Sequence, residues 1–475
     1  MVKSRVFEER QTLSDVGDDN NDNDDNMDDI ERFEETIIAV SNPPIHHHHR
    51  TVDWTSLPHD TTIGIFGLLS YRDRARLACV CQTWRQLGTS HRLWKSIDMR
   101  PHALDLSTAS YLSKRCSKLS HIRFRGSMAV SAIIKLESKE LKQLNGDCSR
   151  DLTDAALSML VAKHGQLERV QLGPDCERIT SDAIQAIALC CPKLKSLRLM
   201  GVRDVKGDAI EALTRHCSHL TELGFLDSSV VDEKMLSLST YLQFLSLAGL
   251  RNIQWNTAVN PLSNLHCLVA LDVSRTEITP SVANCFLAME SLQVLCALNC
   301  PLLEEGSSSV FFYPRKKILL SRFTNLKKGL ALLSSQALIG SNNEWATQQD
   351  LKHNDKNGLE ILNWTEWVLS HALLRIADSN IPGLDSFWLK QGTDTLLRLV
   401  KSTQEDVQER AAAALATFVV IDDLNATVDP ARAEAVMRGG GVSLLLDLAK
   451  SRREGVQSEA AKVLKFSCKV VFKVS

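Results

Sequence analysis

The sequence predicts a multidomain repeat protein, in which a small all-helical module is followed by an α/β solenoid and then by an α-helical solenoid. Three patterns support this. Apolar residues recur at three- and four-residue steps between Asp53 and Ile97; a Leu-x-x-Leu-x-Leu phrase returns every 22 to 27 residues between Leu119 and Leu292; and a block that begins at Gly392 is echoed 49 residues later. These periods indicate short helices, strand-and-helix repeats and helical repeats, in that order.

The composition is that of a globular chain with an acidic tail. The 475 residues are 44% hydrophobic and 24% charged, which is enough for about two to four domains. Residues 1–50 hold thirteen acidic against five basic residues, and Gly17–Asp29 has almost no apolar residue, so we expect 1–50 to be a disordered acidic tail. The basic surplus of the remainder is dispersed, which argues against a nucleic-acid partner.

The thirteen cysteines indicate reduced thiols. Their number is odd, they follow no regular framework, and no signal peptide is present, so we expect a cytosolic or nuclear protein. No apolar run approaches the roughly 20 residues of a membrane span. We also find no metal-ligand spacing, phosphate-binding loop or nucleophile beside a base, and therefore expect no metal, no cofactor and no catalytic residue. His164 and His216 are interpreted as repeat-junction residues.

Residues 51–100 carry the helical module. Ser56-Leu57-Pro58 with Asp60 has the features of a helix start, because proline is tolerated in a first turn and an acidic residue there complements the helix dipole. Ile63, Phe66 and Leu69 then share one face. A module of about 45 residues buries a small core and commonly needs a partner. Periodicity alone leaves open whether it docks on a partner or caps the repeats that follow.

The phrases "LPHDTTIGIFGLLSYRDRARLACVCQTWRQL" and "LWKSID" resemble the F-box, a helical module that docks on a Skp-family adaptor of cullin-based ubiquitin ligases. The resemblance implies that both the adaptor and the cullin are partners. It also implies a set of adaptor-binding residues: Leu57, Pro58, Ile63, Phe66, Leu69, Leu77, Val80 and Trp84.

Residues 101–306 carry the first repeat array. The first anchors of eight phrases are Leu119, Leu141, Leu167, Leu194, Leu220, Leu242, Leu268 and Leu292, and their spacing is that of leucine-rich repeats. Alternating apolar residues predict a strand in each repeat, followed by a helix. Stacking of such units predicts a horseshoe-shaped solenoid lined by its strands. On the inner strands, Glu168, Arg169 and Arg198 are candidates for binding a protein substrate.

Residues 307–389 break the pattern, and we interpret them as a helical connector. "YPRKKILLSRF" and "LNWTEWVLSHALLRIA" are expected to be amphipathic helices, whereas residues 334–358, rich in Asn, Ser and Gln, are expected to form a loop. Trp345, Trp364 and Trp367 are interpreted as packing between the two arrays, in preference to a ligand cage.

Residues 390–475 hold two echoes of a short helix, a turn and a longer helix, which resemble armadillo repeats. Leu396-Leu397 aligns with Leu445-Leu446, and Val407-Gln408 aligns with Val456-Gln457. The residues "DDLNATVDPARAEAV" between them are expected to supply a loop and a short first helix. About three units are needed to close such a core, so we expect the array to be incomplete and the sequence to be truncated or a short product.

The order of F-box, leucine-rich repeats and armadillo repeats, with phrases such as "QLGPDCERITSDAI" and "ATFVVIDD", resembles the plant Arabidillo family, which is related to β-catenin. The resemblance implies a non-catalytic substrate receptor of a cullin-type ubiquitin ligase, associated with the nucleus and with developmental signalling such as root branching. Arg315-Lys316-Lys317 is the basic cluster that could support nuclear entry, and the cytoplasm is the other location. A scaffold that never enters a ligase is the alternative function.

Overall fold

The computed structural model describes residues 54–474, apart from 70, 101–103, 114, 127, 148–149, 230–237, 239, 306–316, 340–347, 380, 382, 423–426 and 452–453. The chain divides into two units, Met1–Thr61 and Thr62–Ser475. The expected acidic tail, Trp345, and Arg315 and Lys316 of the basic cluster lie outside the described residues. Within the first unit the structure describes a short 3-10 helix, η2 (Trp54–Ser56), and the beginning of helix α2 (His59–Gly67).

The expected helical module is present. After α2 come α3 (Tyr71–Leu77), α4 (Gln82–Gly88) and the 3-10 helix η3 (His91–Trp94). Helix α4 is capped by Cys81, whose sulfur accepts a hydrogen bond from the backbone nitrogen of Trp84. This cap satisfies one of the backbone donors that a helix leaves free at its start.

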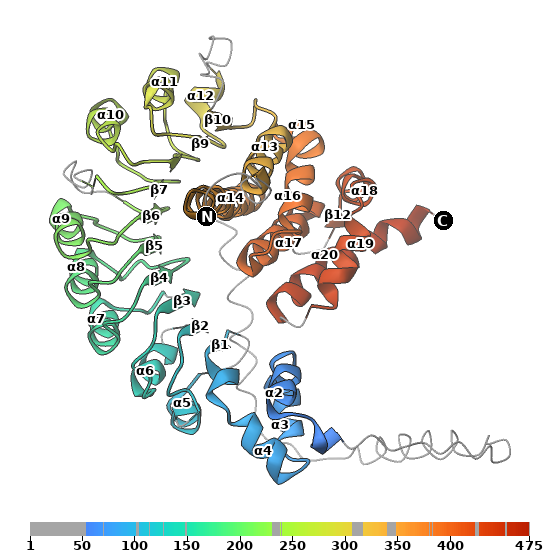
Figure 1. Cartoon of the computed structure of the whole chain (residues 1–475). Helices are drawn as coiled ribbons and strands as arrows, with labels where there is room; N and C mark the ends of the chain where they lie inside the picture. The colour runs from blue at the N-terminus through green and yellow to red at the C-terminus, as the bar shows by residue number, and fades with distance from the viewer. Residues whose placement is uncertain are drawn as a thin grey trace, which may run out of the picture. The chain divides into compact units, whose positions relative to one another are not determined.

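The second unit contains one parallel sheet of ten strands, hydrogen-bonded in chain order from β1 to β10. The strands are β1 (Ser96–Asp98), β2 (His121–Arg125), β3 (Gln143–Asp147), β4 (Arg169–Leu172), β5 (Ser196–Met200), β6 (Glu222–Leu226), β7 (Phe244–Ser246), β8 (Ala270–Asp272), β9 (Val294–Cys296) and β10 (Ile318–Leu320). The helices that follow the strands are α5 (Leu106–Ser113), α6 (Met128–Lys135), α7 (Asp154–Lys163), α8 (Ser181–Cys190), α9 (Gly207–His216), α10 (Trp255–Ser263), α11 (Pro280–Ala288) and α12 (Pro301–Glu305). They lie on one face of the sheet (Figure 1).

Two of these strands correct the sequence analysis. The eight anchors predicted β2 to β9, but "LWKSID" also continues into β1, and the stretch expected to be an amphipathic helix contains β10. Both pair in parallel with their neighbours, Ile97 beside Ile122 and Leu319 beside Leu295. Strand pairing and burial decide the conformation of these two segments, whatever their local periodicity. Each added strand covers an edge of the sheet and buries further apolar side chains in the core.

A ladder of apolar side chains is the centre of the fold. One residue from each strand stacks on the next, in the order Ile97, Ile122, Leu144, Val170, Leu197, Leu223, Leu245, Leu271, Leu295 and Leu319. All ten are buried in one cluster with the apolar faces of the helices. No single repeat could bury this surface, so each depends on its neighbours.

Gly146 in β3 offers a direct test of this packing. A Cβ atom there would lie 2.6 Å from the ring of Phe124 and 3.0 Å from the side chain of Leu172. We expect Gly146→Ala to lower the free energy of unfolding by about 1–3 kcal/mol, because the flanking strands cannot both move away. Gly64→Ala in α2, where nothing lies within 4 Å, should be neutral or slightly stabilising. Equal denaturation midpoints for the two variants would contradict this packing argument.

The C-terminal half of the second unit is helical. Its long helices are α13 (Leu326–Ile339), α14 (Gln348–Ser379), α17 (Glu405–Val419) and α20 (Glu454–Val474), and α14, α17 and α20 pack in series. The shorter ones are α15 (Asp385–Phe387), the π-helical turn η5 (Trp388–Gly392), α16 (Thr393–Leu399), α18 (Pro430–Arg438) and α19 (Gly441–Ala449). A hairpin of β11 (Val420–Asp422) and β12 (Thr427–Val428) precedes α18. The predicted armadillo-type helices are therefore confirmed, and α13 with α14 extends the same stack.

The loop expected at 334–358 is wrong at both of its ends, since α13 continues to Ile339 and α14 begins at Gln348. Packing explains the difference. A Cβ at Gly358 would lie 3.2 Å from the Cα of Ala337, so the missing side chain lets the two helices approach closely. Polar residues of α13 such as Ser335 and Gln336 lie on its exposed side, where they do not oppose helix formation.

Candidate functional site

The F-box-like module is held together by a small core and one arginine. Phe66 is only 1% exposed and contacts the edge of Trp84, with ring centroids 5.7 Å apart. The guanidinium of Arg74 donates to the carbonyl oxygens of Phe66 at 2.7 Å, Gly67 at 3.0 Å and Leu93 at 3.0 Å. Arg74 therefore fixes the end of α2 against α3 and η3.

An apolar surface remains exposed on this module. Ile65 and Leu68 are 39% and 56% exposed, and Val80 after α3 is 63% exposed. These apolar side chains are available to a partner, because they are exposed and are not part of the module's own core. In the first unit, Trp54 is also exposed. We call Ile65, Leu68 and Val80 the docking residues.

The eight adaptor-binding residues expected from the sequence differ in their exposure to solvent. Val80 and Pro58 are exposed, and Leu57 is half-buried. Phe66 is buried, and the half-buried side chains pack against the same core: Ile63, Leu69, Leu77 and Trp84. Their roles in adaptor binding stay predictions. Sequence reasoning missed Ile65 and Leu68; the available signal was that both fall between the positions of the buried stripe.

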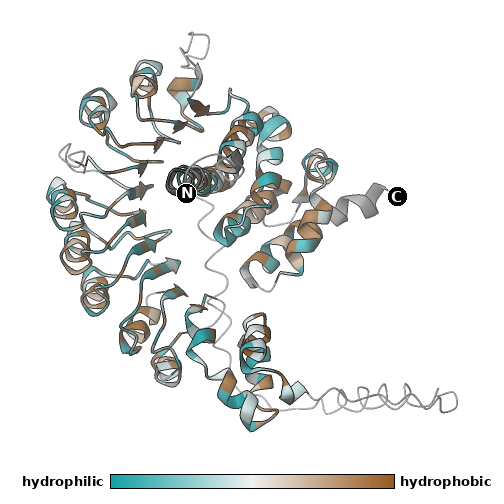
Figure 2. Ribbon diagram, viewed as in Figure 1, coloured by the Kyte–Doolittle hydropathy of each residue, from teal (hydrophilic) through white to brown (hydrophobic). Residues whose placement is uncertain are grey.

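The face of the sheet opposite helices α5–α12 changes from polar to apolar between β1 and β10. One row runs Asp98, Arg123, Asn145, Gln171, Arg198, Gly224, Ser246, Asp272, Cys296 and Leu320 from strand to strand. The parallel row runs Ser96, His121, Gln143, Arg169, Ser196, Glu222, Phe244, Ala270, Val294 and Ile318. The face is therefore polar over β1–β5 and mostly apolar over β7–β10, where Figure 2 shows strongly hydrophobic strands.

Helices α13 and α14 cover the apolar part. Phe244, Val294, Cys296 and other residues of these strands are buried in one cluster with α13 and α14. Trp364 of α14 packs against Phe244, with ring centroids 5.7 Å apart. Trp364 and Trp367 are both buried. Their predicted role in packing between the two arrays is confirmed.

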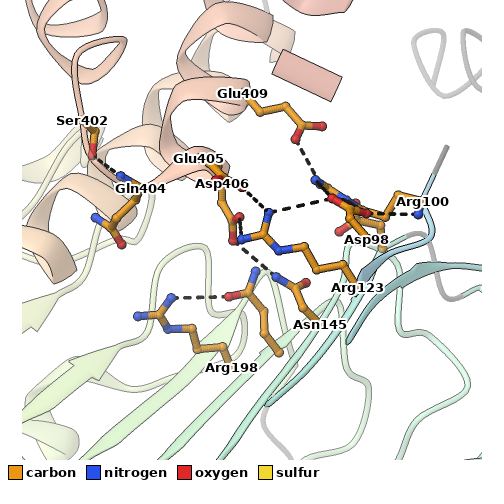
Figure 3. A network of polar contacts seen from close by, with 12 residues as sticks. Asp98, Arg100, Arg123, Asn145, Arg198, Ser402, Gln404, Glu405, Asp406 and Glu409 are labelled. Carbon is orange, nitrogen blue, oxygen red and sulfur yellow. Dashed lines mark hydrogen bonds and ion pairs between the residues drawn. The ribbon is translucent and has the colours of Figure 1, made fainter. Parts of the chain in front are cut away.

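The polar part meets the first turn of α17 (Figure 3). The guanidinium of Arg100, just after β1, binds Asp98 at 2.7 Å, Asp147 at 3.3 Å and Glu409 of α17 at 3.0 Å. It thereby connects two strands of the sheet to a helix that lies 309 residues away in the chain.

Arg123 of β2 makes the second connection. Its guanidinium binds Glu405 at 3.0 Å and Asp406 at 2.9 Å. The side-chain amide of Asn145 in β3 also donates to Asp406, at 3.3 Å. We call these contacts of Arg100, Arg123 and Asn145 with the first turn of α17 the polar latch.

Mutual charge keeps two of these carboxylates ionised. Burial alone would raise the pKa of Asp98, but the hydrogen bond and charge of Arg100 outweigh it, so the pKa lies below its usual value. At Asp406 burial is likewise outweighed, by Arg123 and Arg410, and the pKa is lowered. Burial dominates at Glu409 and raises its pKa. At neutral pH Asp98 of β1 and Asp406 of the latch are therefore both ionised.

The three substrate-binding candidates are not equally open. Arg169 is exposed at the start of β4. Glu168 lies between Lys142 and Lys195, at 3.0 and 2.7 Å, and their hydrogen bonds lower its pKa to about 2. Arg198 lies over the ring of Trp367 at 3.9 Å and pairs with Glu222. Arg198 is thus engaged by α14, and a substrate role for all three stays a prediction.

The other chemical features are sparse in the described part of the chain. Among those residues no group of His, Cys, Asp and Glu could hold a metal ion, and no helix there has both the length and the hydrophobicity to cross a membrane. Burial raises the pKa of the Cys191 thiol to about 12 and lowers the pKa of His164. Both residues belong to the packed core of the repeats.

Comparisons with known proteins place these features in context. Residues 54–100 match the F-box-like family. Protein ARABIDILLO 1 of Arabidopsis thaliana is 51% identical over 421 residues, covering 88% of this chain and 45% of that protein. Protein ARABIDILLO 2 of the same plant is 51% identical, covering 87% and 45%. F-box/LRR-repeat protein 21 of Ovis aries is 23% identical over 216 residues, covering 40% and 49%. The chain therefore spans less than half the length of the two plant proteins.

Proposed function

We propose that this chain, a homologue of the plant Arabidillo family that contains an F-box, acts as a substrate receptor of a cullin-based ubiquitin ligase. In this proposal the F-box segment binds a Skp-family adaptor, and the repeat arrays hold a protein substrate. The observation that carries it is the match at residues 54–100 together with the exposed docking residues in that same segment.

The mechanism in this proposal is proximity. Holding a substrate beside a ubiquitin-charged enzyme raises the effective concentration of the reacting groups, and no covalent chemistry is required of the receptor. The geometry is compatible with that role, because the stacked sheet and the packed helices offer large surfaces on which a substrate can be held. We also propose that the protein acts in the nucleus, which the distribution of a fluorescent fusion in plant cells would test.

Docking should depend on a few apolar side chains. Residues that become fully desolvated at an interface commonly contribute more than about 2 kcal/mol each, which corresponds to roughly a thirtyfold change in affinity. Ile65, Leu68 and Val80 are already exposed, so changing them removes contact surface without opening the core.

We therefore expect Ile65→Asp, Leu68→Asp and Val80→Asp each to lower adaptor affinity by about thirtyfold or more, because each places a charge in an apolar contact. The measurement is co-purification and titration of the full chain with a purified Skp-family adaptor. Leu106→Asp in α5 is the matched control, since Leu106 is similarly exposed, at 53%, but lies outside the module.

Full adaptor binding by all three variants, with unchanged circular dichroism, would exclude this face as the contact. If the unaltered chain also failed to bind the adaptor and cullin, the ligase proposal would fall and the scaffold alternative would remain. Leu57→Ala, compared with the same control, separately tests the anchor expected from the sequence.

A further inference from the structure

The helical half of the second unit touches the sheet in two chemically different ways. Over β7–β10 the contact is apolar and buried, with Trp364 against Phe244 and with α13 and α14 in a common cluster with the strands. Over β1–β3 it is the polar latch, in which side chains of both signs meet. Figure 3 shows the second contact, with Glu405, Asp406 and Glu409 directed toward Arg100, Arg123 and Asn145.

The two contacts differ in their response to salt. Apolar burial is not weakened by charge screening, whereas ion pairs with access to water are screened by salt. The charged side chains of the latch keep a small part of their surface exposed, from 13% for Arg100 to 27% for Arg123. The ion pairs of the latch are therefore the salt-sensitive part of the contact, whereas the contact of α14 is apolar.

Several basic side chains lie on the part of the sheet beneath the latch. His121 lies two residues before Arg123 on β2, and burial together with the charges of Arg169 on β4, Arg123 and Lys142 lowers the pKa of His121. Asp98 and Asp147 neutralise part of the positive charge of Arg100, and the carboxylates of α17 neutralise more of it. When those three carboxylates leave, the arginines lose their partners from across the contact.

We propose that Arg100 and Arg123 form a docking site for an acidic peptide segment of a protein partner, and that the first turn of α17 occupies this site in the closed state. The chemistry of the partner follows from the occupant. Glu405, Asp406 and Glu409 present three carboxylates within about one helical turn, so a segment of similar charge density reproduces the contact. This inference rests on the proposed receptor function in one respect: it takes the acidic partner to be the substrate.

The test uses the full chain and a fluorescent peptide with the sequence of residues 403–412, TQEDVQERAA, supplied in trans. A peptide in which the three acidic residues are replaced by amides serves as the probe control. Binding is measured by fluorescence anisotropy at low and high salt. We expect the acidic peptide to bind and the amide control peptide not to bind. The affinity of the acidic peptide should fall as salt rises, because the contact consists of ion pairs.

Two variants should shift that affinity in opposite directions. Glu405→Gln with Glu409→Gln weakens the internal occupant, so the peptide should bind about tenfold more tightly, because a larger fraction of chains is open. Arg100→Gln with Arg123→Gln removes the site, so binding should fall about tenfold or more. Glu434→Gln in α18 is the matched control, because Glu434 is exposed and pairs with Arg438 on its own helix; this variant should bind as the unaltered chain does.

The gain expected of the glutamate variant requires an intact sheet with Arg100 and Arg123 in place, so the test does not depend on the arginine variant alone. No gain in the glutamate variant, or unchanged binding in a folded arginine variant, would overturn the proposal. Adaptor co-purification should stay the same in every variant. A chain that binds adaptor but not peptide would refute this docking site while leaving the receptor function standing.

Discussion

Phe66→Ala should lower the local free energy of unfolding of the F-box helices by about 3–5 kcal/mol, the range for deleting a fully buried aromatic side chain. Phe66 is 1% exposed, contacts the edge of Trp84, and is followed by the backbone that Arg74 holds. Adaptor binding should disappear as well, but through loss of the module's structure and not through loss of a direct contact.

Hydrogen exchange separates these two causes. Amides of α2, α3 and α4 should lose protection in Phe66→Ala, while those of β4 and β5 should keep it, since local unfolding need not spread through a repeat array. Ile65→Ala is the matched control: the neighbouring residue is exposed, so protection should stay the same while adaptor binding weakens. A Phe66→Ala chain with unchanged exchange and no adaptor binding would instead make Phe66 a contact residue.

This prediction shows what the sequence could and could not give at the F-box. The three-residue steps of Ile63, Phe66 and Leu69 correctly placed these side chains on one face. A stripe of apolar residues, however, does not say whether it faces its own core or a partner. In the structure this face packs inward, and Ile65 and Leu68 on another side of the chain are exposed.

The repeat array was more predictable, because a fixed period constrains every unit in the same way. The phrase Leu-x-x-Leu-x-Leu identified eight strands, and only the end strands β1 and β10 escaped, since their phrases are shortened to "KSID" and "KILLS". The end of the array carries a further signal. The last strands are apolar on both faces, as in "VLC" and "ILL", which indicates that something covers both sides.

The polar latch, by contrast, could not be predicted from local pattern. Arg100 and Glu409 are 309 residues apart, and neither lies in a sequence motif that indicates a pairing with the other. Acidic residues in the first turn of a helix are usual, because they complement the helix dipole, so Glu405 and Asp406 gave no sign of a distant partner. Only the placement of α14 on the apolar strands brings α17 to the polar ones.

Because α17 depends on the placement of α14, we also expect a large loss of stability when Trp367 of α14 is replaced. Trp367 is 1% exposed in α14, and the guanidinium of Arg198 lies 3.9 Å from its ring centroid. Trp367→Ala should lower stability by about 3–5 kcal/mol through the cavity left behind, with about 1 kcal/mol or more added by the lost cation-π contact. Arg198 keeps Glu222 as a partner, so the loss comes from packing and not from an unpaired charge.

The consequence should reach the latch, because α14 also packs against α17. We expect faster hydrogen exchange in α14 and α17, a lower denaturation midpoint, and tighter binding of the acidic peptide, since a loosened α14 no longer holds the acidic turn of α17 over Arg100 and Arg123. Leu359→Ala on the same helix is the matched control, because Leu359 is half exposed and should leave all three measurements unchanged. If the two variants behaved alike, α14 would not be the anchor of the helical array, and the latch would have to hold it alone.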